Sequence, residues 1–296
     1  MRLSRSLLNC HWCRLAIIGA LLWALGGCST VQVGYNQGPM LAWWWLDRQL
    51  DFDSVQKPRV QQALADWFAW HRRSQLADYH DELARLQRLV LQPTLAPAEL
   101  CALVPAWQQR LRVAAEPLLA PAAELVRTLT PAQLDHLQRH LAEGLDDARR
   151  EFLPDDAAER QQRALKRAVE RYEGFYGSLD EAQQRLLAEA LAQSPFDAQR
   201  WLAERRARQQ ALLQSLRQWQ AERADAQTIA AGLRRLLDEM LVSPRPDYRE
   251  LQRRNAEAGC VLTARLHAST SPAQRQKAAE RLRRWQDDLR ALQSRS

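Results

Sequence analysis

Residues 129–152 read LTPAQLDHLQRHLAEGLDDARREF, and this stretch decides the fold class. Thr130 is a favoured N-cap residue, Pro131 suits the first helical position, and Gln133 is placed to close a capping box with Thr130. Apolar residues then recur at spacings of three and four, at Leu134, Leu137, Leu141, Leu145, Ala148 and Phe152. This spacing puts one apolar stripe on an amphipathic helix and predicts that the helix packs against other helices.

The same helix opening recurs at residues 95–99 (LAPAE), 179–183 (LDEAQ) and 271–274 (SPAQ). The unequal spacing of these openings argues against a solenoid repeat. Only five glycines and one isoleucine follow Pro39, whereas Leu, Ala, Gln, Arg and Glu, all good helix formers, dominate. The sequence therefore predicts an all-α fold, an irregular multi-helix bundle that forms a single domain over residues 39–296.

Further helices are expected from the apolar periodicity and from start and stop residues. Gly177 is the expected C-cap of a helix that ends at Tyr176, and Pro244 and Pro246 separate the last two segments. The expected segments are 39–50, 54–91 (as one helix or two), 155–176, 197–223, 226–242 and 247–268.

The first residues of the chain look like a targeting signal. Residues 1–14 carry three arginines and no acidic residue, and 11 apolar residues follow from Leu15. A membrane-spanning helix needs about 20 apolar residues, so this run has the length of a signal-peptide core. It ends in Leu-Gly-Gly-Cys28, which resembles the lipobox of bacterial lipoproteins. An ordinary secretory peptide with a chance cysteine is the alternative.

We therefore expect residues 1–27 to be a cleaved signal peptide, Cys28 to be lipidated, and residues 28–38 to form a tether. Cys28 would carry a diacylglycerol thioether and an N-acyl chain, and two or more acyl chains anchor a protein stably. Ser29, in place of an aspartate, resembles the outer-membrane sorting pattern of Gram-negative lipoproteins. These features predict an outer-membrane protein that faces the periplasm.

The net charge gives little reason to expect nucleic acid as a partner. The chain has 42 basic and 35 acidic side chains, a formal net charge of +7, and loss of the three arginines in the signal segment leaves +4. Six Arg-Arg pairs are spread along the chain rather than clustered. We expect them on solvated helix faces, and binding to anionic lipid headgroups or cell-wall polymer is the alternative.

Cys101 and Cys260 are the remaining cysteines of the mature chain. Disulfides form in the oxidising periplasm. A bridge would close a loop of about 160 residues, worth roughly 4–5 kcal/mol in the chain-entropy model. We expect this disulfide, and two separate buried thiols are the alternative because both residues have apolar neighbours.

Trp43, Trp44 and Trp45 form an aromatic run near the expected lipid anchor. Tryptophan rings favour the membrane interface. Three consecutive residues of a helix nevertheless point in three directions, so they do not all face one surface. We expect these rings to be buried in the bundle, with the membrane interface as the alternative.

His136 and His140 are four residues apart, a spacing that suits two imidazole ligands of one metal ion. The zincin pattern requires a glutamate after the first histidine, and Leu137 occupies that position. Glu143 and Asp147 share the same helix face. We expect a solvated face with histidine–carboxylate pairs, and weak binding of zinc or copper is the alternative.

Two resemblances can be named on particular residues. The box at 129–133, on an all-helical secreted chain, resembles the LTxxQ motif of periplasmic stress chaperones and metal-stress sensors. A second resemblance, to an uncharacterised family of Gram-negative lipoproteins with a domain of unknown function, implies the address and the helical fold but no catalytic residue. It is carried by Tyr35-Asn36, Pro39, Trp44-Trp45-Leu46-Asp47, Leu50-Asp51, Trp70-His71-Arg72-Arg73, the box at 129–133, Phe175-Tyr176-Gly177 and Trp201-Leu202-Ala203-Glu204-Arg205.

No catalytic motif is recognisable, because the sequence has no GxSxG, no SxxK and no glycine-rich phosphate loop. We expect no enzyme activity and no cofactor, and a protein that acts by binding an unfolded protein or an envelope partner. The alternatives are a structural or assembly accessory of the envelope and a weak metal-binding stress sensor. A concave apolar surface would favour chaperone-like binding, and a flat interface near the tether would favour assembly.

Overall fold

The computed structural model describes residues 29–294, so the expected signal peptide and Cys28 lie outside the described residues. The described part contains twelve helices and no strand, which confirms the all-α prediction. The helices are α2 (Thr30–Asn36), α3 (Gly38–Leu50), α4 (Gln56–Ser74), α5 (Leu76–Val90), α6 (Pro97–Val126), α7 (Pro131–Phe152), α8 (Ala157–Tyr176), α9 (Glu181–Ala192), α10 (Ala198–Ala221), α11 (Ala226–Leu241), α12 (Pro246–Ala268) and α13 (Pro272–Gln293).

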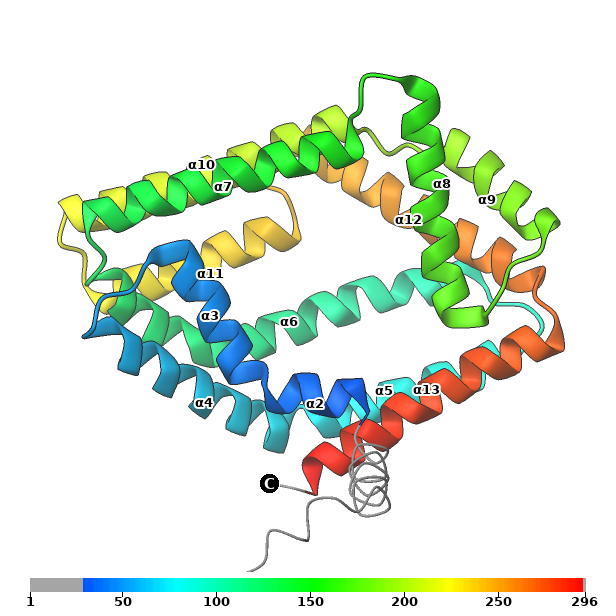
Figure 1. Cartoon of the computed structure of the whole chain (residues 1–296), viewed down its shortest axis with the longest axis horizontal. Coiled ribbons are helices and arrows are strands. Elements are labelled where there is room, and N and C mark those ends of the chain that lie inside the picture. Colours follow the sequence, from blue (N-terminus) through cyan, green and yellow to red (C-terminus); the bar gives the residue numbers. More distant parts are fainter. Residues whose placement is uncertain (1–28, 295–296) are drawn as a thin grey trace, which may run out of the picture.

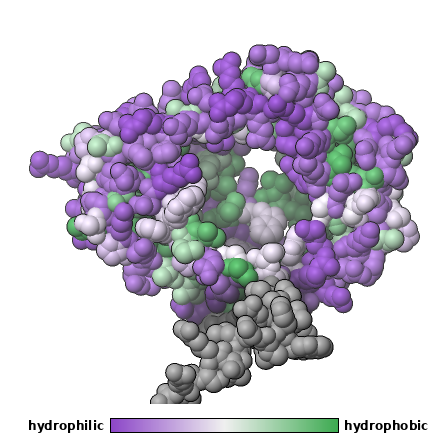
Figure 2. All heavy atoms as spheres, viewed as in Figure 1, coloured by the Kyte–Doolittle hydropathy of each residue, from purple (hydrophilic) through white to green (hydrophobic). Residues whose placement is uncertain are grey.

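The helices pack in pairs around a central opening (Figure 1). Helix α5 packs along α13, α7 along α10, α8 along α9 and α3 on α4, and α6 packs on both α11 and α12. The space-filling view shows that side chains leave the opening free, and that hydrophobic residues gather on its wall (Figure 2). The bundle therefore takes the form of a ring of helix pairs.

The hydrophobic core is divided into four clusters instead of one. The largest joins the end of α6 to α7, α10 and α11, and its most deeply buried members include Ala123, Leu134 and Ile229. The others join α5, α8 and α13, then α3 and α4, and finally α8, α9 and α12. Every member of the four clusters lies between Ala42 and Trp285, so a chain that begins at Ser29 keeps the whole described core and is expected to fold by itself.

Helix α7 begins with the capping box that the sequence predicts. Thr130 Oγ1 accepts a hydrogen bond from the Gln133 N–H at 3.2 Å, and Gln133 Oε1 accepts one from the Thr130 N–H at 2.9 Å. The predicted stripe faces the core, since Leu134, Leu137, Leu145 and Ala148 are buried and Leu141 packs against the same cluster.

Gln133 also ties α7 to a second box that sequence analysis missed. Asp53 and Gln56, at the start of α4, exchange the same two hydrogen bonds at 2.8 and 3.1 Å. The side-chain amides of Gln56 and Gln133 then bond to each other, with N–O distances of 2.7 and 3.3 Å. Each amide also donates to a carbonyl before the other box, Gln133 to Asp51 O at 3.0 Å and Gln56 to Thr128 O at 2.9 Å. We call this arrangement the first glutamine corner.

The boxes at α9 and α13 form a second glutamine corner with the same pattern. Gln183 and Gln274 bond to each other through their amides at 2.9 Å in both directions. Gln183 donates to Ser269 O at 3.0 Å and Gln274 to Ser178 O at 2.9 Å. The recurring motif therefore joins helix starts that lie far apart in the sequence.

The box at residues 95–99 differs from the other four. Ala96 has no side-chain acceptor, so only half of the box forms, with Glu99 Oε2 accepting from the Ala96 N–H at 3.2 Å. Helix α6, which begins here, then continues for 30 residues through Pro105, Pro117 and Pro121. Each of these prolines removes a backbone donor. The helix continues because α4, α11 and α12 pack on it.

One segment differs from the sequence-based expectation, and another takes one of the two expected forms. The expected tether is helical from Thr30 to Asn36, with Gly34 inside α2. Gln32 is buried there and donates to Asp288 Oδ1 of α13 at 2.9 Å, so the segment packs on the ring. The segment 54–91, expected as one helix or two, is two helices, which meet between Ser74 and Leu76.

Candidate binding surfaces

The helices that border the central opening carry large apolar side chains that remain exposed. Helices α6, α11 and α12 border the opening, and hydrophobic residues are seen around it (Figures 1 and 2). On α6, Val104 is 39% exposed and Leu111 53% exposed. They are seven residues apart and therefore lie on one face of the helix. Other exposed large apolar residues of these helices are Trp107, Val113, Met240 and Val261, and Val242 follows the end of α11.

The contacts of α6 show why this strip stays uncovered. On one side, Arg112 Nε bonds to Asp238 Oδ1 at 2.7 Å and Gln108 Nε2 to Leu241 O at 3.4 Å, both on α11. On another side, Arg110 Nε bonds to Asp78 Oδ2 of α5 at 2.6 Å. At 100° per residue, the face of Val104 and Leu111 lies between these two packed sides. The neighbouring helices thus hold α6 on both flanks and leave an apolar strip between them, which we call the opening strip.

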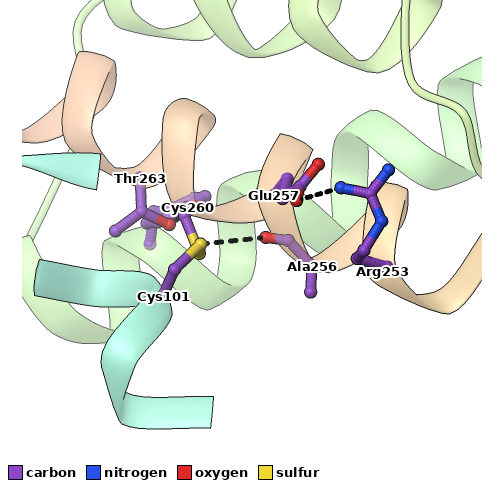
Figure 3. Close-up of a disulfide and its surroundings, with 7 residues drawn as sticks. Cys101, Arg253, Ala256, Glu257, Cys260 and Thr263 are labelled. Carbon is purple, nitrogen blue, oxygen red and sulfur yellow. Dashed lines mark hydrogen bonds and ion pairs between the residues drawn. A yellow bond between two sulfur atoms is a disulfide. The ribbon is translucent and has the colours of Figure 1, made fainter. Parts of the chain in front are cut away.

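A disulfide joins α6 to α12 close to the opening strip. The Sγ atoms of Cys101 and Cys260 are 2.12 Å apart and the two Cα atoms 5.6 Å apart. Figure 3 shows the bridge between the two helices, with the ion pair of Arg253 and Glu257 nearer the start of α12. The bridge links positions that are 159 residues apart and fixes how α6 and α12 pack.

A second exposed apolar surface lies on α2 and α3. Trp44 and Trp45 are 56% and 58% exposed, and their exposed apolar neighbours include Val33, Met40 and Leu41. Trp43 alone is partly buried, against the cluster of α3 and α4. The expected burial of all three rings is therefore not what the structure shows, because α3 packs on α4 and α7 and the rings point in different directions. We call this surface the α2–α3 face.

Two of the sequence runs that carry the family resemblance, Tyr35-Asn36 and Trp70-His71-Arg72-Arg73, meet where α2, α4 and α5 come together. The Tyr35 hydroxyl lies 2.9 Å from His71 Nδ1, and the Tyr79 hydroxyl lies 3.3 Å from His71 Nε2. Arg72 donates to Asn36 Oδ1 at 2.8 Å and its guanidinium lies over the Tyr35 ring. Burial lowers the pKa of His71 and raises the pKa of Tyr35 to about 12. The cluster thus holds an uncharged histidine at neutral pH.

A second histidine is buried in the same way. The Tyr176 hydroxyl lies 2.8 Å from Nδ1 of His267, and Nε2 of His267 lies 2.8 Å from Gln92 O. A carbonyl only accepts, so Nε2 carries the proton and Nδ1 accepts from Tyr176. Burial lowers the pKa of His267 and raises that of Tyr176. Through these two hydrogen bonds His267 joins α12 to α8 and to the segment after α5. We therefore assign the pair a role in holding the helices together.

His136 and His140 lie together on the surface of α7, with ring centroids 4.6 Å apart. His136 Nε2 is 3.0 Å from Arg48 O, and His140 Nδ1 is 3.1 Å from Glu143 Oε2. Each ring thus has a protein partner for one of its nitrogens. Over residues 29–294, no group of three His, Cys, Asp or Glu side chains is arranged to hold a metal ion.

Sequence reasoning missed the capping box of Asp53 and Gln56 and the opening strip for different reasons. Phe52, Asp53 and Gln56 have the spacing of an apolar residue, a cap and a glutamine, so a search without a required leucine or proline finds them. Val104 and Leu111 follow a helical period like that of any core residue. Their exposure depends on where α4, α5, α11 and α12 pack.

Comparisons with known proteins find one family and no named relative. A family model described as a family of unknown function (DUF6279) matches residues 48–249. The match spans α4 to α11 in full and agrees with the uncharacterised family expected from the sequence. The curated proteins and the solved structures contain no match. Among residues 29–294, no helix has the length and apolar character to cross a bilayer.

Proposed function

The chain belongs to this family of unknown function, and we propose that it is a lipid-anchored protein of the periplasm that binds unfolded or partly folded proteins without catalysis. The opening strip is the observation that carries this proposal. It is apolar and uncovered, and it lies on α6, one of the helices that border the central opening, which favours a client-binding role over a flat assembly interface.

An exposed apolar strip suits a chain that has lost its own core contacts. Soluble proteins seldom leave contiguous apolar patches uncovered unless those patches bind something. Burying apolar surface is favourable by about 25 cal/mol per Å², regardless of the sequence that supplies it. Aliphatic side chains such as Leu111 and Met240 therefore support binding of many different unfolded segments.

The start of the described chain supports the proposed anchor. Cys28 directly precedes Ser29, whose Oγ caps α2 by accepting from the Gln32 N–H at 3.2 Å. An acyl group on Cys28 would hold α2 and α3 near the bilayer. The exposed rings of Trp44 and Trp45 are the kind that bind at the membrane interface. We propose that the protein is anchored in the outer membrane and faces the periplasm.

An assembly role is the second candidate, and the α2–α3 face favours it. Met40, Leu41, Trp44 and Trp45 form an exposed apolar surface beside the proposed anchor. A neighbouring envelope protein would bury such a surface as readily as a bilayer. In that case the ring would be a spacer and the opening strip would bind no client.

The test of the proposal uses residues 29–296 and a reduced, unfolded client at a stoichiometric ratio. We expect the protein to suppress light scattering by the client. The double change Val104→Gln and Leu111→Gln should weaken suppression by about tenfold, because it removes the apolar strip. Val113→Gln is the matched control. Val113 is 39% exposed, like Val104, but its side chain lies on the opposite side of α6.

Two results would contradict the proposal. One is a protein that does not delay aggregation at any ratio tested. The other is a double variant that retains its melting temperature and suppresses aggregation as well as the unaltered protein. Either result, combined with cross-links from Trp44 or Trp45 to an envelope protein in cells, would favour the assembly role.

A further inference from the structure

A long groove lies at the junction of α7, α8, α9 and α10, apart from the opening strip. Its volume is about 1270 Å³, and it is bordered by the end of α7, one side of α8, the end of α9 and the start of α10. Apolar side chains form much of its lining, among them Phe152, Leu165, Leu191 and Phe196. Phe196 is 46% exposed, so part of this apolar surface is open to a ligand.

Four arginines line the groove, and their charges are not neutralised by neighbours. Arg149, Arg160, Arg167 and Arg171 form no ion pair with any carboxylate of residues 29–294. Arg160 donates only to the carbonyls of Pro154 and Asp155, at 2.7 and 2.9 Å. Other arginines of the same region are paired, as Arg163 is with Glu159 at 2.6 Å.

The acidic side chains in the lining are fewer, and one is already engaged. Only Asp155 and Asp197 among the lining residues carry a negative charge. Asp197 caps α10, because its Oδ1 accepts from the Arg200 N–H at 3.0 Å. The groove therefore combines a surplus of positive charge with an apolar lining.

The guanidinium of Arg167 shows how the two properties meet in one place. It lies over the Phe152 ring, 4.5 Å from the ring centroid. This contact holds the charge at the edge of the apolar lining while its N–H groups remain available. Arg171 is one turn further along α8 and is exposed.

We propose that this groove binds an anionic amphiphile, with the alkyl chain on the apolar lining and the phosphate or carboxylate head at Arg167 and Arg171. Guanidinium groups bind both oxyanions through paired hydrogen bonds. The volume exceeds that of most small-molecule pockets, which leaves room for a long chain. The site uses none of the residues of the opening strip, so it stands independently of client binding.

The experiment is a calorimetric titration of residues 29–296 with dodecyl phosphate below its aggregation concentration. We expect binding to one site. Inorganic phosphate tests the head alone, and dodecyl maltoside tests the same chain with an uncharged head. Both should bind at least about tenfold more weakly, because each lacks half of the recognised chemistry.

The double variant Arg167→Gln and Arg171→Gln should lose about tenfold in affinity for dodecyl phosphate. Arg163→Gln, a change of a paired arginine on the same helix, is the matched control and should bind normally. The double variant Val104→Gln and Leu111→Gln should bind dodecyl phosphate as tightly as the unaltered protein, because neither residue lines the groove. Failure of the client-binding proposal can therefore be distinguished from failure of this one.

Three outcomes would overturn the proposal: equal binding of the uncharged amphiphile, equal binding by a folded double arginine variant, or an acidic amphipathic peptide that binds the groove when dodecyl phosphate does not. The Arg163→Gln control separates the expected loss of affinity in the double arginine variant from a general effect of lost positive charge.

Discussion

The opening strip and the α2–α3 face are both apolar and exposed, but they differ in shape and in what holds them. The opening strip lies on a long helix that is fixed on two flanks and bridged to α12 by the disulfide. The α2–α3 face lies on two short helices that pack on α4, α7 and α13. The first lies on a helix that borders the central opening and is formed by the aliphatic side chains of Val104 and Leu111, and the second carries the two exposed tryptophans (Figure 1).

This difference shows why exposed apolar area alone does not assign a role. An uncovered aliphatic surface beside an opening can bury apolar side chains of a flexible chain. Tryptophan combines an apolar ring with an N–H donor, which suits the boundary between lipid and water. We therefore infer two surfaces with two partners, and each of the following predictions separates them.

Removal of the disulfide should have the largest effect. Cys101→Ser with Cys260→Ser opens a link across 159 residues and should lower the free energy of unfolding by about 2–5 kcal/mol, as measured by urea titration; the upper end is the chain-entropy value for so long a loop. Client binding should weaken as well, because α6 and α12 lose their fixed packing. Vesicle binding through the α2–α3 face should persist; an equal loss on both surfaces would show that they are not independent.

A change in the first glutamine corner should have the next largest effect. Gln133→Ala removes an amide that bonds to Gln56, to Asp51 O and to the Thr130 N–H, and leaves buried partners unsatisfied. We expect a loss of about 1–3 kcal/mol in the free energy of unfolding. Since Asp51 ends α3, vesicle binding should suffer more than client binding. Gln62→Ala, at an exposed position of α4, is the control and should change the stability little.

The tryptophan pair should have a smaller effect that is confined to one surface. Trp44→Ser with Trp45→Ser should lower the partition of residues 29–296 onto anionic vesicles by about tenfold, which corresponds to about 1.4 kcal/mol. The melting temperature should stay close to that of the unaltered protein, because both rings are mostly exposed. Unfolding of this variant would instead place the rings in the core.

A pH change should have the smallest effect. Burial lowers the pKa of His71 and His267 in the folded state, so the unfolded chain binds more protons below the ordinary histidine pKa of 6.5. The contribution of these two uncharged histidines to the stability is therefore fully present above that pH and is lost as the pH falls. Between pH 7.5 and 6.5 we expect a loss of at most about 0.4 kcal/mol per histidine.

The control for the pH prediction is His71→Gln, which should reduce the slope of stability against pH over this range. Client binding should not follow the same slope, because the exposed side chains of the opening strip carry no titratable group. A rise in stability on acidification would contradict the assignment of uncharged buried histidines.

The features of this fold that depend on residues close together in the chain could be predicted from the sequence. The cap at Thr130, the stripe from Leu134 to Ala148 and the helix end at Gly177 depend on neighbours within a few turns, and the structure has all three. The long-range part could not be read in this way. Gln133 looks like a residue that caps its own helix, and its bond to Gln56 depends on how two distant helix starts meet.

The candidate binding surfaces were harder to predict than the fold. The spacing of apolar residues in α6 predicts that one face of the helix is apolar. The same spacing occurs whether that face is buried in the core or left exposed. Three interior prolines also conceal the continuity of this helix. For Trp44 and Trp45, only the packing of α3 on one side decides that two rings stay exposed.

The most direct test of client binding at the opening is a photo-cross-link from single positions of the folded protein. A benzophenone side chain would replace Leu111, Val113 or Trp45 in turn, and each protein would be irradiated with a reduced, unfolded client. We predict cross-links from position 111 and few from positions 113 and 45. Equal cross-linking from the three positions, or cross-links from position 45 alone, would contradict the account.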